Sequence, residues 1–376
     1  MSHPKITSVR TLLVRLPLAR PMAGPFGELA TRHNLIVVIE TDGGPRGIGE
    51  VWSNFPPWGC AERKEIVDRC LAPLLLGQTL DDPVRLYRLM HERTRLLALQ
   101  WGAPGPVHQA VAGVDIALWD AHARHLGRPL RQVIADGHHP PDEVPVYASG
   151  IGPDDTVERI EASRVAGHSR FKIRIPFGIA VARRMLREAR SASGEAPLMA
   201  DGNQALTVAE AETLIPDLSE ARLQWLEEPF PIDDVVAYLD FAGKSSVPLA
   251  WGENARGVDG LDRCIESPAQ VIQPDITKTL GISEGLVVGR RVIAAGKRLC
   301  FHMYGGPIGL IASAQLTAAL KGADWLEMDA NPNPLYDRVI ETPPRLRDGC
   351  LVLDNTPGLG LTLARDYEDQ LQAAPA

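Results

Sequence analysis

The sequence predicts an α/β fold in which a TIM-like (β/α) barrel follows a smaller α+β domain. Eight short apolar runs between residues 143 and 328 alternate with helical segments, and most successive runs end 22 to 28 residues apart. That spacing is typical of one strand and one helix per unit of a barrel. The chain has 376 residues, too many for one ordinary compact core but suited to a barrel with an added domain.

The N-terminal part of the chain shows strand patterns first and helical patterns afterwards. Val, Ile, Leu and Thr predict a strand over residues 5–16, and the turn sequence TDGGPRG predicts a hairpin over 34–52. Helical spacing follows over 61–99 and 106–126. We therefore expect an α+β domain over residues 1–130.

The eight apolar runs predict the strands of the barrel, which we place within residues 143–345. They are VPVYAS (144–149), RFKIRI (170–175), PLMAD (197–201), LQWLE (223–227), PLAWGE (248–253), QVIQPD (270–275), RLCFH (298–302) and ADWLEM (323–328). The last segment, 346–376, contains a strand and turns but no further strand–helix unit. We expect it to pack back on the N-terminal domain.

Composition and charge exclude several classes of protein. The chain is 45% hydrophobic and 23% charged, with a net charge of −8 and no dominant basic patch, which argues against a nucleic-acid partner. It has no run of about 18 apolar residues that could span a membrane, and no apolar signal core at its N-terminus. The five cysteines are widely spaced without a CxxC pair, which favours reduced thiols. We expect a cytoplasmic protein.

Carboxylates end three successive strands of the predicted barrel. Asp201, Glu227 and Glu253 follow one another at equal spacings of 26 residues. The carboxyl ends of barrel strands meet at one mouth, so these side chains should converge and repel one another. A divalent cation removes that repulsion, and Mg²⁺ prefers oxygen ligands. Each acid alone could instead be a helix N-cap, but the equal spacing favours a metal site. Glu228, beside Glu227, would then tune the site.

The remaining strand ends carry groups suited to proton transfer and anion binding. Asp275 and His302 end neighbouring strands, where a carboxylate can orient an imidazole and raise its basicity. Lys172 and Arg174 lie two apart on the second strand and point to one face. Glu327 lies near the end of the eighth strand.

Five stretches of the chain resemble the enolase superfamily, and its mandelate racemase-like subgroup in particular. They are IALWDAHARHLGRPL (116–130), DGNQ (201–204), LEEP (226–229), GEN (252–254) and QPDITKTLGIS (273–283), to which the strand of His302 is added. The resemblance implies that an α+β capping domain closes over a (β/α)7β barrel. It implies Mg²⁺ bound by Asp201, Glu227 and Glu253.

The resemblance also implies a chemistry, the removal of a proton α to a carboxylate. The cation stabilises the enediolate charge as it develops. An Asp275–His302 dyad and a Glu327 that hydrogen-bonds the substrate carboxylate complete the implied site. We expect a small-molecule carboxylate as the partner. The resemblance also implies that the chain forms a homo-oligomer.

One position departs from the family pattern. Members that use two bases carry Lys-x-Lys on the second strand, and here the sequence is Lys172-Ile173-Arg174. Arginine stays protonated and is a poor base, but it is a good clamp for a carboxylate or hydroxyl group. Arg174 could equally pair with nearby acids or act as an unusual base, and Lys172 could be an electrostatic anchor or a base. Lys278, three past Asp275, is a weaker candidate for the base, and the sequence favours a surface lysine of the following loop.

The sequence therefore favours a Mg²⁺-dependent dehydratase that converts a sugar acid to a 2-keto-3-deoxy acid. A racemase or epimerase of a hydroxy acid or amino acid derivative is the alternative, and it needs a competent base opposite His302. A non-catalytic scaffold is a third possibility. A cycloisomerase is a weaker one, because the sixth strand ends in Asp275 rather than lysine.

Two stretches rich in Gly and Pro, residues 20–30 and 51–59, are expected to be mobile loops that close over the substrate. Their aromatic residues could shield the site from water or pack beneath the loops. They are Phe26, Trp52, Phe55 and Trp58, of which Trp52 is a candidate substrate contact.

Overall fold

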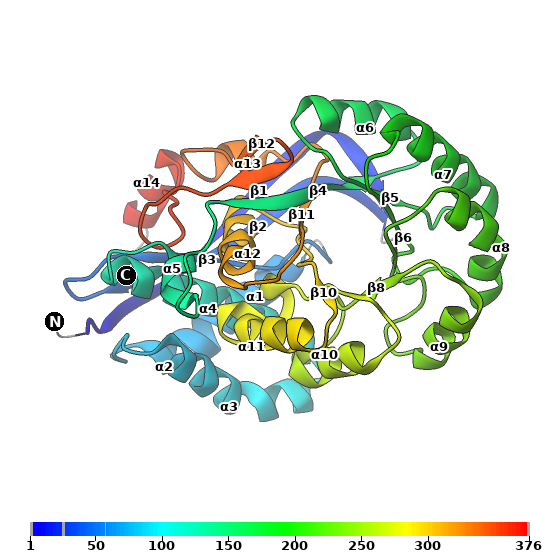
Figure 1. The fold of residues 1–376 in the computed structure, drawn as a ribbon. Helices are drawn as coiled ribbons and strands as arrows, with labels where there is room; N and C mark the ends of the chain where they lie inside the picture. Colours follow the sequence, from blue (N-terminus) through cyan, green and yellow to red (C-terminus); the bar gives the residue numbers. More distant parts are fainter. Residues whose placement is uncertain (1–2, 25–26, 57, 374–376) are drawn as a thin grey trace.

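The computed structural model describes residues 3–24, 27–56 and 58–373. Within them, eight parallel strands form a closed barrel (Figure 1). The strands are β4 (Glu143–Ile151), β5 (Phe171–Arg174), β6 (Leu198–Asp201), β7 (Leu226–Glu227), β8 (Leu249–Trp251), β9 (Val271–Ile272), β10 (Arg298–Leu299) and β11 (Leu326–Asp329). Each pairs with the next, β11 pairs with β4, and a bridge from Phe301 to Leu326 closes the ring.

Helices follow the first seven strands of the barrel and surround it. They are α6 (Thr156–Val165), α7 (Ile179–Ser193), α8 (Val208–Glu220), α9 (Val235–Lys244), α10 (Gly257–Glu266), α11 (Gly281–Ala294) and α12 (Pro307–Ala319). A short π-helical turn, η2 (Ile276–Leu280), precedes α11. The predicted (β/α)7β barrel with an N-terminal capping domain is confirmed, and the eight apolar runs are its strands.

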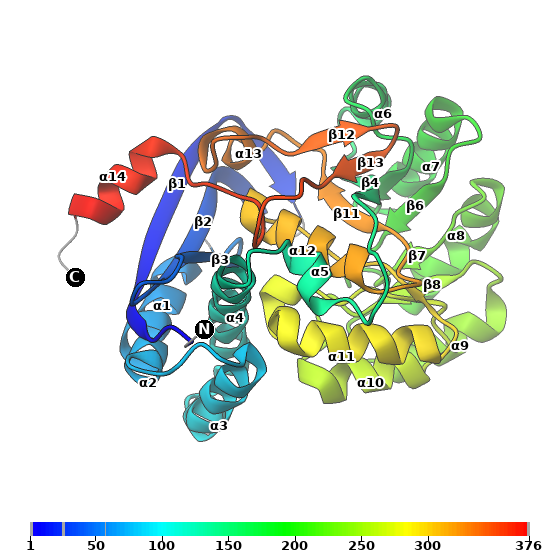
Figure 2. The same cartoon turned by 60° about the vertical axis from the view of Figure 1, so that its left-hand side comes forward.

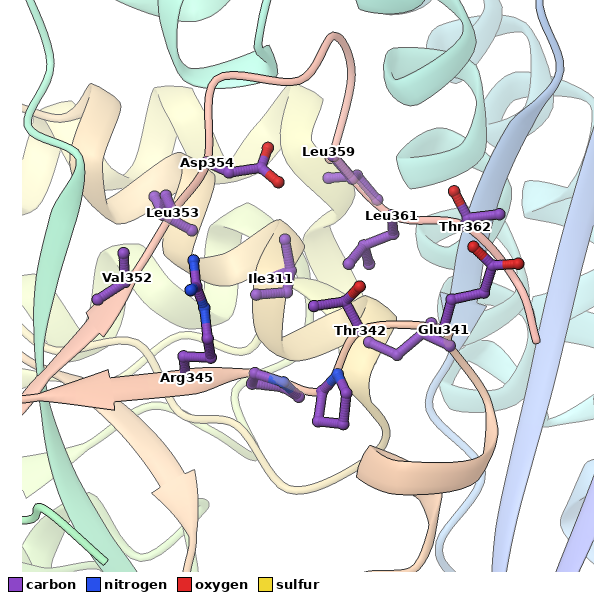
Figure 3. A pocket seen from close by; sticks show the side chains of 14 residues that line it. Ile311, Glu341, Thr342, Arg345, Val352, Leu353, Asp354, Leu359, Leu361 and Thr362 are labelled. Carbon is purple, nitrogen blue, oxygen red and sulfur yellow. The ribbon is translucent and has the colours of Figure 1, made fainter.

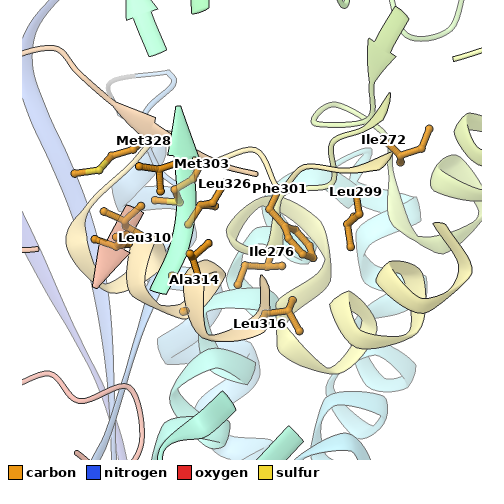
Figure 4. Close-up of a cluster of buried hydrophobic side chains, with 14 of the residues drawn as sticks. Ile272, Ile276, Leu299, Phe301, Met303, Leu310, Ala314, Leu316, Leu326 and Met328 are labelled. Carbon is orange, nitrogen blue, oxygen red and sulfur yellow. The ribbon is translucent and has the colours of Figure 1, made fainter. Parts of the chain in front are cut away.

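The barrel interior is a packed core, as the alternation of strand side chains requires. One buried layer inside the ring consists of Tyr147, Met199, Trp225, Ala250, Val271 and Cys300. A second buried cluster lies between the strands and their helices. Figure 4 shows Phe301 and Leu326 of the barrel wall together with Leu310 and Ala314 of α12, all fully buried. This rigid wall fixes where the strand ends point.

The capping domain combines a three-stranded antiparallel sheet with helices (Figure 2). Its elements are β1 (Ile6–Gly24), β2 (Gly27–Thr41), β3 (Gly47–Val51), α1 (Gly59–Ile66), η1 (Val67–Leu71), α2 (Ala72–Leu75), α3 (Pro83–Trp101), α4 (Pro104–His125) and α5 (Leu130–Ile134). The expected loop over residues 20–30 is wrong, because β1 pairs with β2 as far as Gly24 and Gly27. The ladder is interrupted by a register shift between Pro17 and Met22, and it resumes from Met22 to Gly24 opposite Gly27 to Leu29.

The C-terminal segment divides its contacts between barrel and cap. β12 (Arg345–Arg347) and β13 (Cys350–Val352) form a hairpin, and β13 pairs with barrel strand β4. A short helix, α13 (Leu335–Arg338), precedes them. The final helix α14 (Arg365–Ala373), which the sequence pattern did not predict, reaches the capping domain through a Glu368–Arg46 ion pair. The C-terminal segment therefore packs on the cap through α14, as expected, whereas its hairpin pairs with the barrel. The division at residues 130, 143 and 345 stays a prediction.

Buried polar contacts join the cap to the rim of the barrel. Arg32 of β2 pairs with Asp329 of β11 at 2.6 Å, and both side chains are almost fully buried. Glu50 of β3 accepts hydrogen bonds from the Gly306 and Gly309 amides, at 2.6 and 2.9 Å, where α12 begins. A carboxylate at a helix N-terminus accepts hydrogen bonds from free backbone amides and interacts favourably with the helix dipole. The cap is therefore held against the end of the barrel where the catalytic strand ends lie.

We predict that Asp329→Asn destabilises the protein by on the order of 3 kcal/mol. The substitution leaves the buried Arg32 guanidinium without its counter-charge, and breaking one side of a buried pair is costly. Urea unfolding followed by tryptophan fluorescence measures the change. Glu195→Gln, which breaks an exposed pair with Arg222, is the control and should leave the midpoint unchanged. Equal midpoints for the two variants would refute the role given to the buried pair.

Candidate active site

The strand ends of the barrel and one edge of the cap enclose a cavity of about 220 Å³. Its lining includes Asp201, Glu253, His302, Glu327 and Arg174 from the barrel and Trp52 from the cap. Backbone register places Arg174 beside Asp201, and Asp201 beside Glu227, on three neighbouring strands. Three predicted residues are absent from this lining and are buried. Lys172 contacts the lining through Glu327, Asp275 contacts it through His302, and Glu227 pairs with Lys172. Residues up to 275 positions apart in the chain thus meet at one mouth, as the strand-end pattern predicted.

Lys172 is the buried cation of this mouth. Its ammonium lies 2.5 Å from Glu227, 2.9 Å from Glu327 and 3.8 Å from Asp201. Burial opposes the charge, but these carboxylates outweigh burial, and the pKa of Lys172 is raised above its usual value. The lysine is therefore an ammonium that anchors carboxylates, and in this arrangement it is not a free base.

Asp201 lies in an excess of negative charge. Burial and the neighbouring Glu227 raise its pKa well above the usual value, although Lys172 lowers it. Its oxygens accept hydrogen bonds from the Asn203 backbone amide at 2.7 Å and side-chain amide at 2.9 Å. In the described part of the chain, the Asn203 side-chain oxygen is buried without a hydrogen-bond partner. Crowded carboxylates with an unused oxygen acceptor are the donor set of a hard divalent cation.

The carboxylates are not already arranged as ligands around one point. Among the described residues, no three His, Cys, Asp or Glu side chains form a ready-made metal cluster. Lys172 separates Glu227 from Asp201, and His302 binds Glu253 through its Nε2. A cation that bound the three acids would replace these positive groups as their partner.

Glu228 supports Glu253 through an amide. Its carboxylate accepts hydrogen bonds from the Gly252 backbone amide at 3.1 Å and the Asn254 side-chain amide at 2.6 Å. The same Asn254 amide donates to Glu253 at 2.7 Å. Burial, followed by the charge of Glu253, raises the pKa of Glu228 to about 7. The backbone of Glu228 has φ of 28°, a strained value for a residue with a side chain. Its carboxylate does not line the cavity.

His302 and Asp275 form the predicted dyad. The Nδ1 of His302 lies 2.7 Å from Asp275, which also accepts hydrogen bonds from the Thr277 and Lys278 amides at 2.7 and 3.1 Å. These bonds fix Asp275 at the start of η2, so the carboxylate holds the imidazole with Nε2 facing Glu253 and Glu327. Burial disfavours the imidazolium, but the nearby carboxylates outweigh it and raise the pKa of His302 well above its usual value.

Lys278 is not the surface lysine that the sequence suggested. It lines the cavity and is only 8% exposed. Its ammonium donates to the Asn254 side-chain oxygen at 2.7 Å, lies 3.5 Å from Glu253, and lies 5.0 Å from the centre of the Trp52 ring. The π-helical turn η2 winds the chain inward directly after Asp275, whereas a loop would have released Lys278 to solvent. It is a cation of the site, as the weaker of the two sequence interpretations had it.

The second-strand arginine points into the cavity. Burial lowers the pKa of Arg174, but Tyr304 and Asp201 outweigh it, so the pKa is raised and the guanidinium stays charged. Glu327 has a lowered pKa because Lys172 and His302 outweigh its burial. In this arrangement the carboxylate is ionised and accepts hydrogen bonds. The role of Glu327 toward the substrate carboxylate stays a prediction.

The capping domain closes one side of the cavity. Trp52 and Phe55 line it, together with Met22, Gly27 and Leu29 of the β1–β2 hairpin. Trp58 is 71% exposed and does not shield the site. Phe26, the fourth aromatic residue considered, lies outside the described residues.

A smaller cavity of about 100 Å³ lies between α12 and the C-terminal segment (Figure 3). Arg345, Asp354 and Glu341 line it, together with Ile311 of α12, and its lining contains none of the predicted site residues. The chemistry is therefore expected at the mouth of the barrel.

Across the described residues, no helix is both long and apolar enough to cross a membrane.

Two family models match the chain. The N-terminal domain of mandelate racemase and muconate lactonizing enzyme matches residues 6–135, and the enolase C-terminal domain-like model matches residues 155–367. Among curated proteins, D-galactarolactone cycloisomerase of Agrobacterium fabrum is 28% identical over 96% of this chain and 97% of its own length. L-Talarate/galactarate dehydratase of Salmonella typhimurium is 28% identical over 96% of this chain and 89% of its own length.

Solved structures agree with these matches. A mandelate racemase/muconate lactonizing enzyme from Bordetella bronchiseptica superposes with a TM-score of 0.88 and 36% identity, over 97% of this chain and 99% of that one. A racemase from Streptomyces coelicolor with bound magnesium superposes with a TM-score of 0.86 and 25% identity, over 98% of this chain and 100% of that one. The chain belongs to the enolase superfamily, in its mandelate racemase and muconate lactonizing enzyme branch.

Proposed function

We propose that this chain is a Mg²⁺-dependent dehydratase of a sugar acid. It removes the proton α to the carboxylate and releases the β-hydroxyl group as water, which gives a 2-keto-3-deoxy acid. The names of two similar proteins, D-galactarolactone cycloisomerase and L-talarate/galactarate dehydratase, point to acids derived from sugars. The observation that carries the choice of reaction is that His302 is matched across the cavity by a permanently charged arginine rather than by a second free base.

Asp201, Glu227 and Glu253 would hold the cation. Their oxygen-only donor set, the raised pKa of Asp201 and the unpaired Asn203 oxygen all favour Mg²⁺ there. Bound Mg²⁺ would stabilise the negative charge that develops on the carboxylate oxygens of the substrate. Glu228 and Asn254 hold the Glu253 carboxylate through the Asn254 side-chain amide, which would keep it available as a ligand.

His302 takes the α proton at Nε2. Asp275 holds Nδ1, so only Nε2 is directed at the cavity. Glu253 is the first of the charges that favour the imidazolium, and once a cation neutralises Glu253 the imidazole gives up its proton more readily. The neutral ring can then act as the base.

Charged side chains position the substrate. Arg174 clamps a carboxylate or a hydroxyl group, and Glu327 accepts a hydrogen bond from a substrate hydroxyl. Lys172 keeps Glu227 and Glu327 in place from beneath, and the Trp52 ring covers the site from the cap. A small molecule with one carboxylate and several hydroxyl groups suits these partners.

A racemase or epimerase is the second candidate, since a solved relative is a racemase. It needs a base on the side opposite His302. Arg174 stays charged and cannot be that base, which leaves Lys172, whose pKa the neighbouring Glu227 and Glu327 raise against the effect of burial in this arrangement.

A panel of sugar acids incubated with Mg²⁺ in D₂O and followed by proton NMR tests the proposal. Loss of an acid with appearance of a 2-keto-3-deoxy acid supports the dehydratase and identifies its substrate. Deuterium entering C2 with inversion and no keto product would instead support the racemase. An isomer formed without loss of water would indicate a cycloisomerase. No reaction with any acid would overturn the proposal.

We predict that Mg²⁺ raises the melting temperature of the wild-type protein, because a ligand that binds only the folded state stabilises it. Asp201→Asn and Glu253→Gln should lose both this shift and more than about 100-fold of the activity, because each removes a charged ligand. Differential scanning fluorimetry with and without Mg²⁺ measures the shift. Glu195→Gln changes an exposed carboxylate in the same way and should keep the shift. A full shift in both site variants would exclude these ligands.

We predict that His302→Asn abolishes exchange of the α proton, because asparagine fills the space but cannot accept that proton at neutral pH. Proton NMR in D₂O measures exchange directly, and the Mg²⁺-dependent rise in melting temperature should persist. Exchange at the wild-type rate would transfer the role of base to Lys172.

A further inference from the structure

Tyr304 is a residue of the cavity for which neither the sequence nor the proposed function gives a role. Its side chain lines the cavity beside His302, Arg174 and Glu327, and the residue is 8% exposed. Its position is fixed from two sides. The Asn54 side chain of the cap donates a hydrogen bond to the Tyr304 carbonyl, and Asn333 donates to the carbonyl of the next residue at 2.8 Å. The phenol is therefore held at the site and is not a mobile surface group.

Two guanidinium groups face the Tyr304 ring. Arg32 of the cap lies 4.9 Å from the ring centre, and Arg174 of the barrel lies 5.2 Å from it. Arg174 also forms a hydrogen bond with Tyr304. Among the described residues, the Nε and Nη1 atoms of Arg32 have no hydrogen-bond partner, although both are buried. The phenol ring of Tyr304 therefore lies between two positive charges at the edge of the cavity.

Tyr304 and His302 both follow β10, two residues apart, and they differ in their partners. The imidazole is tied to Asp275, which follows β9, and to Glu253, which follows β8. The phenol ring faces Arg174 at the end of β5. Both side chains line the cavity, so one bound substrate lies within reach of the imidazole and the phenol.

We propose that Tyr304 is the general acid of the elimination, an inference that rests on the proposed dehydratase function. His302 takes the α proton, and the electron pair of the broken C–H bond is held in the enediolate. When the enediolate collapses, that pair forms the Cα–Cβ double bond and the Cβ–O bond breaks with its electrons on oxygen. The Tyr304 hydroxyl transfers its proton to this oxygen, which leaves as water. Arg174 and Arg32 face the phenolate that remains until it regains a proton from solvent, while the imidazolium returns its proton to solvent.

This assignment explains the departure from Lys-x-Lys on the second strand. A lysine there could itself exchange a proton with the substrate, whereas Arg174 cannot. Arg174 instead faces the ring of Tyr304, which has a proton to donate. The general acid, Tyr304, then belongs to the loop after β10, and the second strand supplies only the positive charge of Arg174.

The test compares wild type with Tyr304→Phe, using Mg²⁺ and the sugar acid that the wild-type protein consumes in the D₂O screen. The ring stays between the two guanidiniums, so the fold and the Mg²⁺-dependent rise in melting temperature should persist. We expect kcat for formation of the keto acid to fall by about 10²- to 10⁴-fold, the range for loss of a general acid, with little change in KM. Substrate recovered from the variant should carry deuterium at C2, because His302 still removes the proton and the enediolate is reprotonated.

Tyr336→Phe is the matched control. Tyr336 is a buried phenol at the same junction of cap and barrel, it lines a different cavity, and among the described residues its hydroxyl has no partner. That variant should keep the wild-type kcat. Formation of keto acid by Tyr304→Phe within about threefold of wild type would overturn the proposal, as would equal loss of exchange and elimination. A wild-type protein that consumes no sugar acid would instead refute the dehydratase function itself.

Discussion

Charge balance at the mouth of the barrel is the constraint on which the rest of the site depends. Asp201 and Glu227 are buried at the ends of neighbouring strands, and Glu253 follows the next strand and is half-buried. Burial and nearby carboxylates raise the pKa values of Asp201 and Glu227, whereas His302 and Lys278 outweigh burial at Glu253 and lower its pKa. Lys172 compensates two of them, and His302 is drawn to the third. Such buried ion pairs contribute little net stability, because the cost of removing both charges from water offsets their attraction. Their persistence is better explained by a cation that binds there during the reaction.

The capping domain completes the site as much as it covers it. Trp52 donates a backbone hydrogen bond to Thr277 of η2 at 3.3 Å, and its ring lies over Lys278. On the other side, Arg32 pairs with the barrel through Asp329 and faces Tyr304. The cap therefore touches both flanks of the cavity through polar contacts. Because these contacts are buried, a movement of the cap would change the electrostatics of the site together with its access to solvent.

Regular spacing explains which parts were predictable from the sequence. Strand ends converge in any barrel, so the equal intervals between Asp201, Glu227 and Glu253 sufficed to bring these acids together. Lys278 and Tyr304 lie beyond strand ends, where direction depends on local turns. The π-helical turn η2 directs Lys278 inward, and contacts with the cap hold Tyr304 over the second strand. Nothing in their neighbouring residues encodes those tertiary contacts, although Lys278 falls three positions after a predicted catalytic aspartate.

The pairing of lysine and arginine on the second strand gives the two residues different physical roles. Lys172 is buried beneath the cavity, and its charge is paired with the carboxylates of Glu227 and Glu327. Arg174 lines the cavity, and its permanent charge is available to the substrate. A fixed cation there cannot remove a proton, so proton transfer on that side must come from a group that the cation supports. The neighbouring phenol has the required proton, and it lies beside the guanidinium. The electrostatics of this flank therefore favour donation of a proton over its removal, which is the asymmetry that an elimination requires and a racemisation does not.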